Sequence, residues 1–367
     1  MAKKVNSPLE KKKSGVRSVT KKNFVTYLIV IVFYAVFQTL TATGHLKNAY
    51  QSLLVPICYS VVMAVSLNLV VGVLGELSLG HAGFMCVGAY CGAFFSVITK
   101  DVLMTDWLRF VLAMLIGAAV AALAGVIIGI PVLRLKGDYL AIVTLAFGEI
   151  IKTVVNVLYI GKDASGFHIA MSTKNLDMAE DGLLILNGPQ GITGTPKSSN
   201  FTIGFILVML TLLIVTNLMD SRTGRAIMSI RDNRIAAESI GIDVTKYKLM
   251  AFVIAAAIAG CAGVLYAHNL NALTANTNNF GYNMSIMILV YVVLGGLGSV
   301  RGSVIAATIL YALPELFRGV GQYRMLLYAI VLIVMMIVNN GAFFVQMKEK
   351  ALYNIRSGKK NNAKEAA

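Results

Sequence analysis

The chain has 367 residues, of which 57% are hydrophobic and only 13% carry a charge. About a quarter of the residues in a typical soluble domain are charged, so this composition excludes a wholly water-exposed protein and indicates that lipid surrounds much of the chain. Lys and Arg (32) outnumber Asp and Glu (17), but the basic residues lie in tails and short loops between uncharged runs, which argues against nucleic-acid binding.

Uncharged runs near the length of about 20 residues that a helix needs to cross a bilayer recur along the chain. We expect ten spans, at residues 24–43, 51–71, 78–98, 110–132, 139–160, 201–219, 249–268, 284–300, 303–317 and 325–344. The sequence therefore predicts an all-α integral membrane protein with a transmembrane domain over 23–346. Basic tails at 1–22 and 347–367 are expected to be disordered. With both termini in the cytoplasm, most Lys and Arg residues fall on the inner side, as the positive-inside rule requires.

Glycines interrupt two of the apolar stretches. Gly72, Gly75, Gly80 and Gly83 lie in the first, and each would cost a helix up to about 1 kcal/mol relative to Ala. The second holds Gly295, Gly296 and Gly298, and its Leu-Gly pattern resembles that of the first, which hints at an internal repeat. Broken helices occur inside membranes where protein buries them or where they line a cavity, and they often form the substrate sites of transporters. The alternative is that these glycines serve tight packing alone.

Two connecting segments are long. Residues 161–200 are expected to form an external loop, whose structure the sequence leaves open. Residues 220–248 face the cytoplasm and predict an amphipathic helix between Gly224 and Gly241 that contains Ala236, Ala237 and Glu238. Small residues let another backbone approach closely, so this helix either docks on a partner protein or rests on the lipid surface.

Several polar residues within or beside the spans are candidates for function. Glu76 and His81 flank the first Gly-broken stretch, where hydrogen bonds could hold it open or shut. Glu149 has Lys152 three residues later, and the two either neutralise each other or place Glu149 beside a transport path or a subunit contact. The four cysteines have no CxxC spacing and no flanking His, so no metal site is expected.

Several motifs resemble a known family. Ala236-Ala237-Glu238-x-x-Gly241 resembles the EAA-type cytoplasmic loop of ABC-importer permeases, and the longer string from Thr223 to His268 is similar to permeases for branched-chain amino acids. So are Ser66-Leu-Asn-Leu-Val-Val-Gly-x-x-Gly-x-Leu-Ser-Leu-Gly-His81-Ala-Gly-Phe and the run from Leu135 to Ile150. The segment Asn187–Pro196 is similar to the M-type of that family's two permease subunits. The resemblance covers roughly residues 50–340, but Arg301 and Ser303 stand where an aromatic residue and Pro are commoner.

The resemblance implies a permease in the bacterial cytoplasmic membrane that imports leucine, isoleucine and valine by alternating access. It implies two ABC ATPase partners, a second, paralogous permease and an extracytoplasmic substrate-binding protein. ATP and Mg²⁺ would bind in the ATPases; this chain has no GxxxxGK[ST] loop, and no cofactor is expected on it. The residues expected to couple to the ATPases are Arg231, Asp232, Ala236, Ala237, Glu238 and Gly241.

A path for such zwitterions needs an apolar lining with a few uncharged polar groups. The residues expected to line it or flank it are Ser66, Asn68, Glu76, Ser78, His81, Thr144, Phe147 and Glu149. A permease for urea or short amides fits the same motifs. An ion-coupled secondary transporter would need buried acids, for which Glu76 and Glu149 are the candidates, and it would leave the segment 220–248 without a purpose. An intramembrane enzyme is disfavoured because no HExxH motif or nucleophile–base spacing occurs.

Overall fold

The computed structural model describes residues 8–45, 47–100, 105–133, 135, 137–163, 166–172 and 182–340. The predicted C-terminal tail, the first seven residues of the N-terminal tail and residues 173–181 of the external loop lie outside the described residues. The chain divides into two compact units, Met1–Thr308 and Ile309–Ala367. Each unit is described separately.

The first unit is mainly helical. Its helices are α1 (Pro8–Ala42), α2 (Asn48–Gln51), α3 (Leu54–Asn68), a π-helix η1 (Leu69–Leu74), α4 (His81–Ile98), α5 (Asp106–Val132), α6 (Asp138–Val157), η3 (Gly188–Gln190), α7 (Phe201–Asp220), α8 (Arg222–Asp232), α9 (Arg234–Ser239), α10 (Val244–Ala267), α11 (Thr277–Phe280), α12 (Tyr282–Gly295) and the first half of α13 (Val300–Leu316). The described part of the second unit holds the rest of α13, η4 (Phe317–Tyr323) and α14 (Arg324–Asn340).

Each predicted span overlaps a helix, and residues 341–344 of the last predicted span lie outside the described residues. Within the described residues, eight helices are long and apolar enough to cross a membrane: Phe24–Ala42, Asn48–Leu74, His81–Ile98, Asp106–Val132, Tyr139–Val157, Phe201–Asp220, Val244–Ala267 and Val300–Gly319. The other two predicted spans correspond to α12, with 14 residues, and α14, with 17. The α12 helix stops early because Gly296 and Gly298 have left-handed backbones, with φ of 93° and 77°. The prediction of an integral membrane protein built from helices is confirmed.

The N-terminal tail differs from expectation. The first helix begins at Pro8 and continues without interruption into the first span. The prediction of a disordered tail is therefore wrong for residues 8–22, which are helical. Lys, Glu and Arg are good helix formers, and Pro is well tolerated at the first helical position, so the adjoining span can propagate helix into this segment.

Small residues bring the central helices close together. A Cβ on Gly88 of α4 would collide with the backbone of Gly260 in α10, and one on Gly263 would meet the carbonyl of Met85. One turn after Gly88, Gly92 lies against Val264. The Gly88-x-x-x-Gly92 spacing thus marks a close helix contact, as the packing of membrane helices favours.

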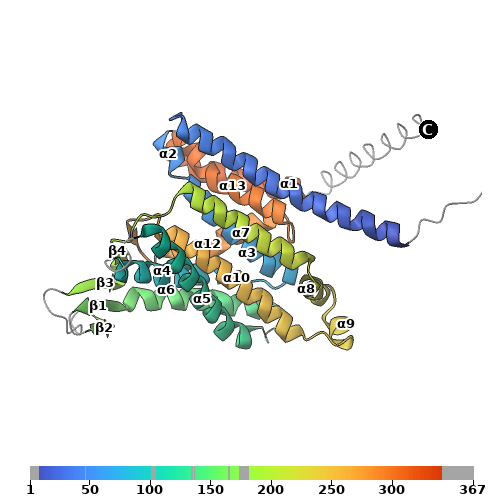
Figure 1. Cartoon of the computed structure of the whole chain (residues 1–367), viewed down its shortest axis with the longest axis horizontal. Helices are drawn as coiled ribbons and strands as arrows, with labels where there is room; N and C mark the ends of the chain where they lie inside the picture. The colour runs from blue at the N-terminus through green and yellow to red at the C-terminus, as the bar shows by residue number, and fades with distance from the viewer. Residues whose placement is uncertain are drawn as a thin grey trace, which may run out of the picture. The chain divides into compact units, whose positions relative to one another are not determined.

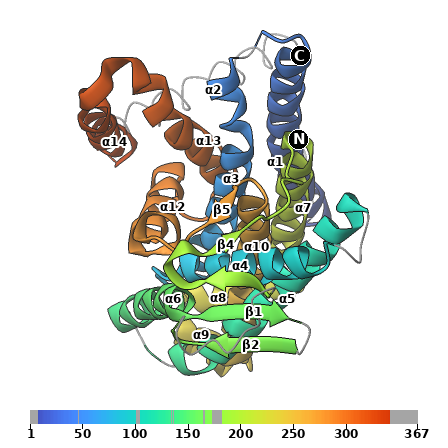
Figure 2. The ribbon, with the colours of Figure 1, turned by 90° about the vertical axis from the view of Figure 1, so that its left-hand side faces the viewer.

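A small antiparallel sheet was not predicted. It consists of β1 (Tyr159–Asp163), β2 (Gly166–Ala170), β3 (Leu183–Asn187), β4 (Ile192–Thr193) and β5 (Ala272–Leu273), in the order β2-β1-β3-β4-β5. Figure 2 shows β2 at one edge of this sheet. Figure 1 shows that the sheet and the α8–α9 segment lie at opposite ends of the helices of the first unit. The two long connections predicted from sequence therefore mark opposite sides of the membrane domain.

Candidate translocation and coupling site

The first Gly-broken stretch is a non-helical segment between η1 and α4. The π-helix ends at Leu74, Gly75 takes a left-handed backbone with φ of 82°, and α4 starts at His81. His81 Nε2 lies 2.6 Å from the hydroxyl of Ser66, which is eight residues and about 12 Å of helix before Leu74. Residues 75–80 therefore turn back into the bundle without helical structure. This is the interruption that the glycine spacing predicted.

The segment packs against α6. The Leu79 amide donates a hydrogen bond to the Thr144 hydroxyl at 3.1 Å. Gly80 lies against the Thr144 carbonyl so closely that a Cβ there would collide with it. The Phe147 ring lies 5.2 Å from that of Phe84, measured between ring centroids. The predicted path residues on α3, α4 and α6 are thus brought together.

These residues are enclosed by protein. At most 1% of the surface of each of Ser66, Asn68, Ser78, His81 and Thr144 is exposed. Two of their polar atoms, Asn68 Nδ2 and Ser78 Oγ, have no hydrogen-bond partner. A buried polar group without a partner costs about 1–3 kcal/mol, so these two atoms are the best placed to gain from a polar ligand.

The two Gly-broken segments meet each other. The Gly298 amide donates to the Asn68 side-chain oxygen at 2.9 Å. A Cβ on Gly72 would collide with both the Asn68 side chain and the Gly298 backbone. The predicted structural glycines each have a local reason: close backbone or side-chain approach at Gly72, Gly80, Gly83 and Gly295, and positive φ at Gly75, Gly296 and Gly298. The contact between the two Gly-broken segments was not predicted, because the spacing of glycines in the sequence does not show which helix breaks face each other.

The segment 220–248 forms two helices rather than the single helix predicted over 224–241. The break is at Asn233, whose backbone is extended and whose side chain accepts a hydrogen bond from the Ala236 amide at 3.1 Å. Asn is a favoured N-cap residue, so it ends α8 and starts α9. The segment turns again at Gly241, with φ of 84°, before α10 begins. The amphipathic pattern hid this break because its period continues across Asn233.

The residues of this segment divide into an inner and an outer set. Ile230, Ala237 and Val244 form a small buried cluster, so Ala237 packs within the segment itself. Asp232, Ala236, Glu238 and Gly241 are exposed, and Glu238 pairs with Arg234 at 2.9 Å. The exposed fractions of Ile235 and Ile240 are 80% and 74%. The outer set therefore combines apolar and charged groups on α9 and the turn after it.

Arg231 points in the other direction. Its guanidinium Nη1 donates to the Gly72 carbonyl of η1 at 2.8 Å, and its Nη2 donates to Asp232 at 3.0 Å. A second link joins Glu76 to Lys248 at the start of α10, an ion pair whose side chains are only 16% and 7% exposed. Lys248 was missed from the sequence, since it is 172 residues from Glu76. Both links connect the segment 220–248 to the first Gly-broken stretch.

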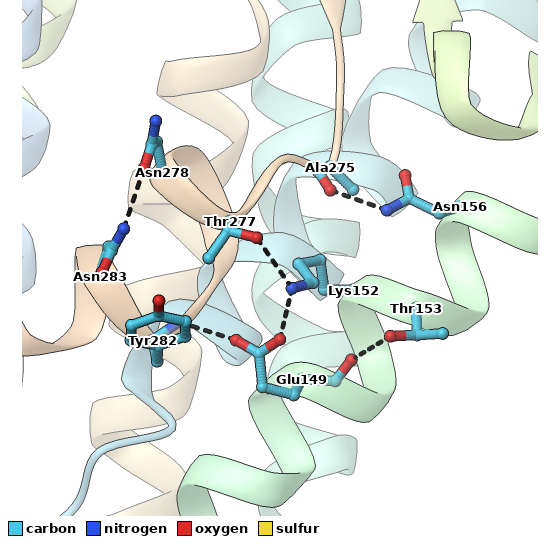
Figure 3. A network of polar contacts seen from close by, with 9 residues as sticks. All are labelled: Glu149, Lys152, Thr153, Asn156, Ala275, Thr277, Asn278, Tyr282 and Asn283. Atoms are coloured by element: carbon cyan, nitrogen blue, oxygen red, sulfur yellow. Dashed lines mark hydrogen bonds and ion pairs between the residues drawn. The ribbon is translucent and has the colours of Figure 1, made fainter.

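Glu149 belongs to a separate network. It pairs with Lys152, as the spacing suggested, and it also accepts a hydrogen bond from the Tyr282 amide at 2.8 Å (Figure 3). Lys152 donates to the Thr277 hydroxyl at 3.1 Å, and the Asn156 side chain donates to the Ala275 carbonyl at 2.9 Å (Figure 3). These contacts fasten α6 to α11 and to the start of α12. They do not join Glu149 to Ser66 or His81.

Comparison with known proteins gives a consistent result. The model of the family described as "Branched-chain amino acid transport system / permease component" matches residues 49–339. The chain is 32% identical over 335 residues to the high-affinity branched-chain amino acid transport system permease protein LivM of Salmonella typhimurium, covering 87% of this chain and 74% of the relative. It is 34% identical to LivM of Escherichia coli over 76% of this chain and 65% of that relative.

A more distant relative carries a different description. The ribose import permease protein RbsC of Escherichia coli is 26% identical over 89% of this chain and 97% of its own length. No solved structure matches the chain.

Proposed function

Because this chain belongs to the branched-chain amino acid transport system permease family and is a membrane-spanning ABC-importer permease, we propose that it imports leucine, isoleucine and valine. Its partners would be two ABC ATPases, a second, paralogous permease and an external substrate-binding protein. ATP hydrolysis would take place in the ATPases. Both termini would lie in the cytoplasm, on the side of α8 and α9.

The observation that carries this proposal is the hydrogen bond from Arg231 to the Gly72 carbonyl, because it links the segment that would contact an ATPase to the proposed path. The exposed α9 would dock on an ATPase through Ala236 and Glu238, with Ile235 and Ile240 supplying apolar contact area. Movement of the docked α9 would pass through α8 to Arg231, and from there to the carbonyl of Gly72. Gly72 adjoins both Asn68 and Gly298, so displacing it would rearrange the two Gly-broken segments and alternate the access of the path.

The enclosed residues suit an amino acid with an apolar side chain. Asn68 and Ser78 supply uncharged polar atoms. Phe84 packs against Phe147, Phe252 and His81 and supplies an apolar group. Such a lining orients a zwitterion without a strong fixed charge. The alternative is a permease for urea or short amides, which the same neutral lining would also serve.

The experiment is uptake of labelled leucine, urea and ribose in cells that lack this chain, and in the same cells restored with wild type, Glu238→Arg or Glu238→Asp. Deletion is expected to remove leucine uptake alone. Glu238→Arg reverses an exposed charge on α9 and breaks its pair with Arg234, so it is expected to abolish uptake while membrane insertion is retained. Glu238→Asp keeps the charge and is the matched control.

Each outcome is informative. If deletion removes uptake of urea or ribose and not of leucine, the protein is still an importer, but the proposal that it carries branched-chain amino acids is wrong. Wild-type leucine uptake by a correctly inserted Glu238→Arg protein would reject α9 as the docking element and favour an ion-coupled transporter.

A further inference from the structure

A cavity borders the second Gly-broken segment, where Gly298 contacts Asn68. It has a volume of about 440 Å³. It is lined by residues of α1, α7, the turn that precedes α13 and the start of α13: Thr26, Thr216, Met219, Asp220, Gly298, Ser299, Val300 and Arg301. None of the proposed path residues is in this set, and the proposed function assigns the cavity no role.

The position of the cavity relates it to the membrane surface. Thr26 is the third residue of the span Phe24–Ala42, and Asp220 is the last residue of the span Phe201–Asp220. Ser221, which follows, is the N-cap of α8. The cavity therefore lies at the level where a span meets the α8–α9 segment, at the depth of lipid headgroups. Only the assignment of this surface to the cytoplasmic leaflet rests on the proposed function.

Arg301 gives the cavity its chemistry. Its Nε donates to the Thr26 hydroxyl at 2.7 Å, which fixes the guanidinium plane. Its Nη2 is buried and has no hydrogen-bond partner. A buried cationic donor without a partner is costly, and guanidinium groups match phosphate oxygens in geometry and charge. The start of α13 adds the partial positive charge of a helix N-terminus.

The surroundings favour a lipid over a free anion. The chain just before Thr26 contains Lys21 and Lys22, and basic segments beside a span attract anionic headgroups. Exposed apolar side chains lie one turn from the lining residues on the same helix faces. They are Ile29, three residues after Thr26 on α1, and Leu213, three residues before Thr216 on α7, with exposed fractions of 39% and 51%. They offer a surface for acyl chains. Asp220, the one acid among the described lining residues, is exposed at the end of α7.

We propose that this cavity binds the phosphate group of an anionic phospholipid through Arg301, with the acyl chains lying along α1 and α7. Because the cavity is bounded by the end of α7, a bound lipid would brace the junction from which α8 departs.

The test measures lipid retention by the full-length protein and needs no transport activity, so its failure is separate from failure of the proposed function. The protein is reconstituted in vesicles of phosphatidylcholine and phosphatidylglycerol, extracted in detergent, and analysed by native mass spectrometry for retained phosphatidylglycerol. Arg301→Gln removes the proposed ligand. Met219→Trp fills the cavity without changing charge. Arg222→Gln is the matched control, since it removes an exposed positive charge from the start of α8 without lining the cavity.

We expect Arg301→Gln and Met219→Trp to reduce retained phosphatidylglycerol at least about tenfold, the effect of losing one charged hydrogen-bond interaction, while Arg222→Gln stays near wild type. If Arg301→Gln does not insert, Met219→Trp decides the question. Equal retention by all the inserted variants would mean that lipid binding does not depend on this cavity and would overturn the proposal. Displacement of the lipid by inorganic phosphate alone would also overturn it, because the cavity would then be a site for a free anion.

Discussion

Arg231 shows how one side chain can serve a role that its position in the sequence conceals. It lies in the segment predicted to contact an ATPase, yet its guanidinium reaches inward to the carbonyl of Gly72. Gly75 lies against its aliphatic stem, where a Cβ would press on the Arg231 side chain. Glycine at 75 therefore serves both a left-handed turn and the approach of this arginine. The contact is a charge-assisted hydrogen bond at a place where helix geometry leaves the carbonyl accessible.

The first prediction at this scale concerns coupling. Arg231→Ala is expected to lower leucine uptake about tenfold or more, because it removes the link between α8 and η1 while leaving the exposed face of α9 intact. The ATPases should still copurify with the variant. Uptake and copurification are measured together.

Arg222→Ala is the matched control, because it truncates an exposed arginine of the same helix, and it should retain both properties. Loss of ATPase copurification with Arg231→Ala would contradict this interpretation and assign Arg231 to the docking surface itself.

At the scale of elements, the positions of helix breaks can be predicted from the sequence. The contacts that the broken segments make are harder to predict. The glycine spacing predicted the interruption over 72–83, because glycine is costly inside a helix. The hydrogen bond from Gly298 to Asn68 joins residues 230 positions apart, and no local pattern reports it. Asn is a strong N-cap residue, so Asn233 is a possible helix break, but the amphipathic period continues across it and favours a single helix.

The sheet was missed for a different reason. Its strands have two to five residues, too few for a period-two pattern to stand out. Its last strand, Ala272–Leu273, comes from beyond α10 and pairs with Ile192–Thr193. Pairing between such distant short segments depends on how the helices bring them together, so the tertiary structure decides it.

The Glu149 network supplies a prediction about how elements are held. Glu149→Gln is expected to lower the free energy of unfolding by about 1–3 kcal/mol, because Lys152, whose side chain is 12% exposed, would lose its charged partner. The measurement is the thermal unfolding midpoint in detergent. Arg318→Gln is the control, because it breaks another pair at the same i,i+3 spacing whose arginine is 66% exposed, and solvent screens such a pair. Equal midpoints for the two variants would show that the network contributes no more than a surface ion pair.

For the whole molecule, the separation of the sheet from the α8–α9 segment gives the membrane domain two distinct ends (Figure 1). The runs of apolar residues predicted the helices in order, because the length of a membrane span is fixed by the bilayer. The uncharged polar residues that we predict for the path are buried, since polar residues are few in such runs and those of α3 and α6 face other helices. The contacts of Thr144 with Leu79 and of Asn68 with Gly298 could not be predicted from the sequence, because they join separate segments.

The last prediction tests which end faces the cytoplasm. The distribution of basic residues predicts that α9 lies inside and the segment before α7 outside, by the positive-inside rule. Lys197→Cys and Ser239→Cys introduce thiols at two exposed positions, one at each end. In intact cells, a membrane-impermeant maleimide is expected to label the Lys197→Cys variant and not the Ser239→Cys variant. Both variants should react after the membrane is opened. The native Cys58 and Cys86 are buried and Cys91 and Cys261 lie within spans, so the wild-type chain gives the background. The reverse labelling pattern would place α9 outside the cell, where no ATPase could reach it. That result would contradict both the predicted orientation and the coupling proposal.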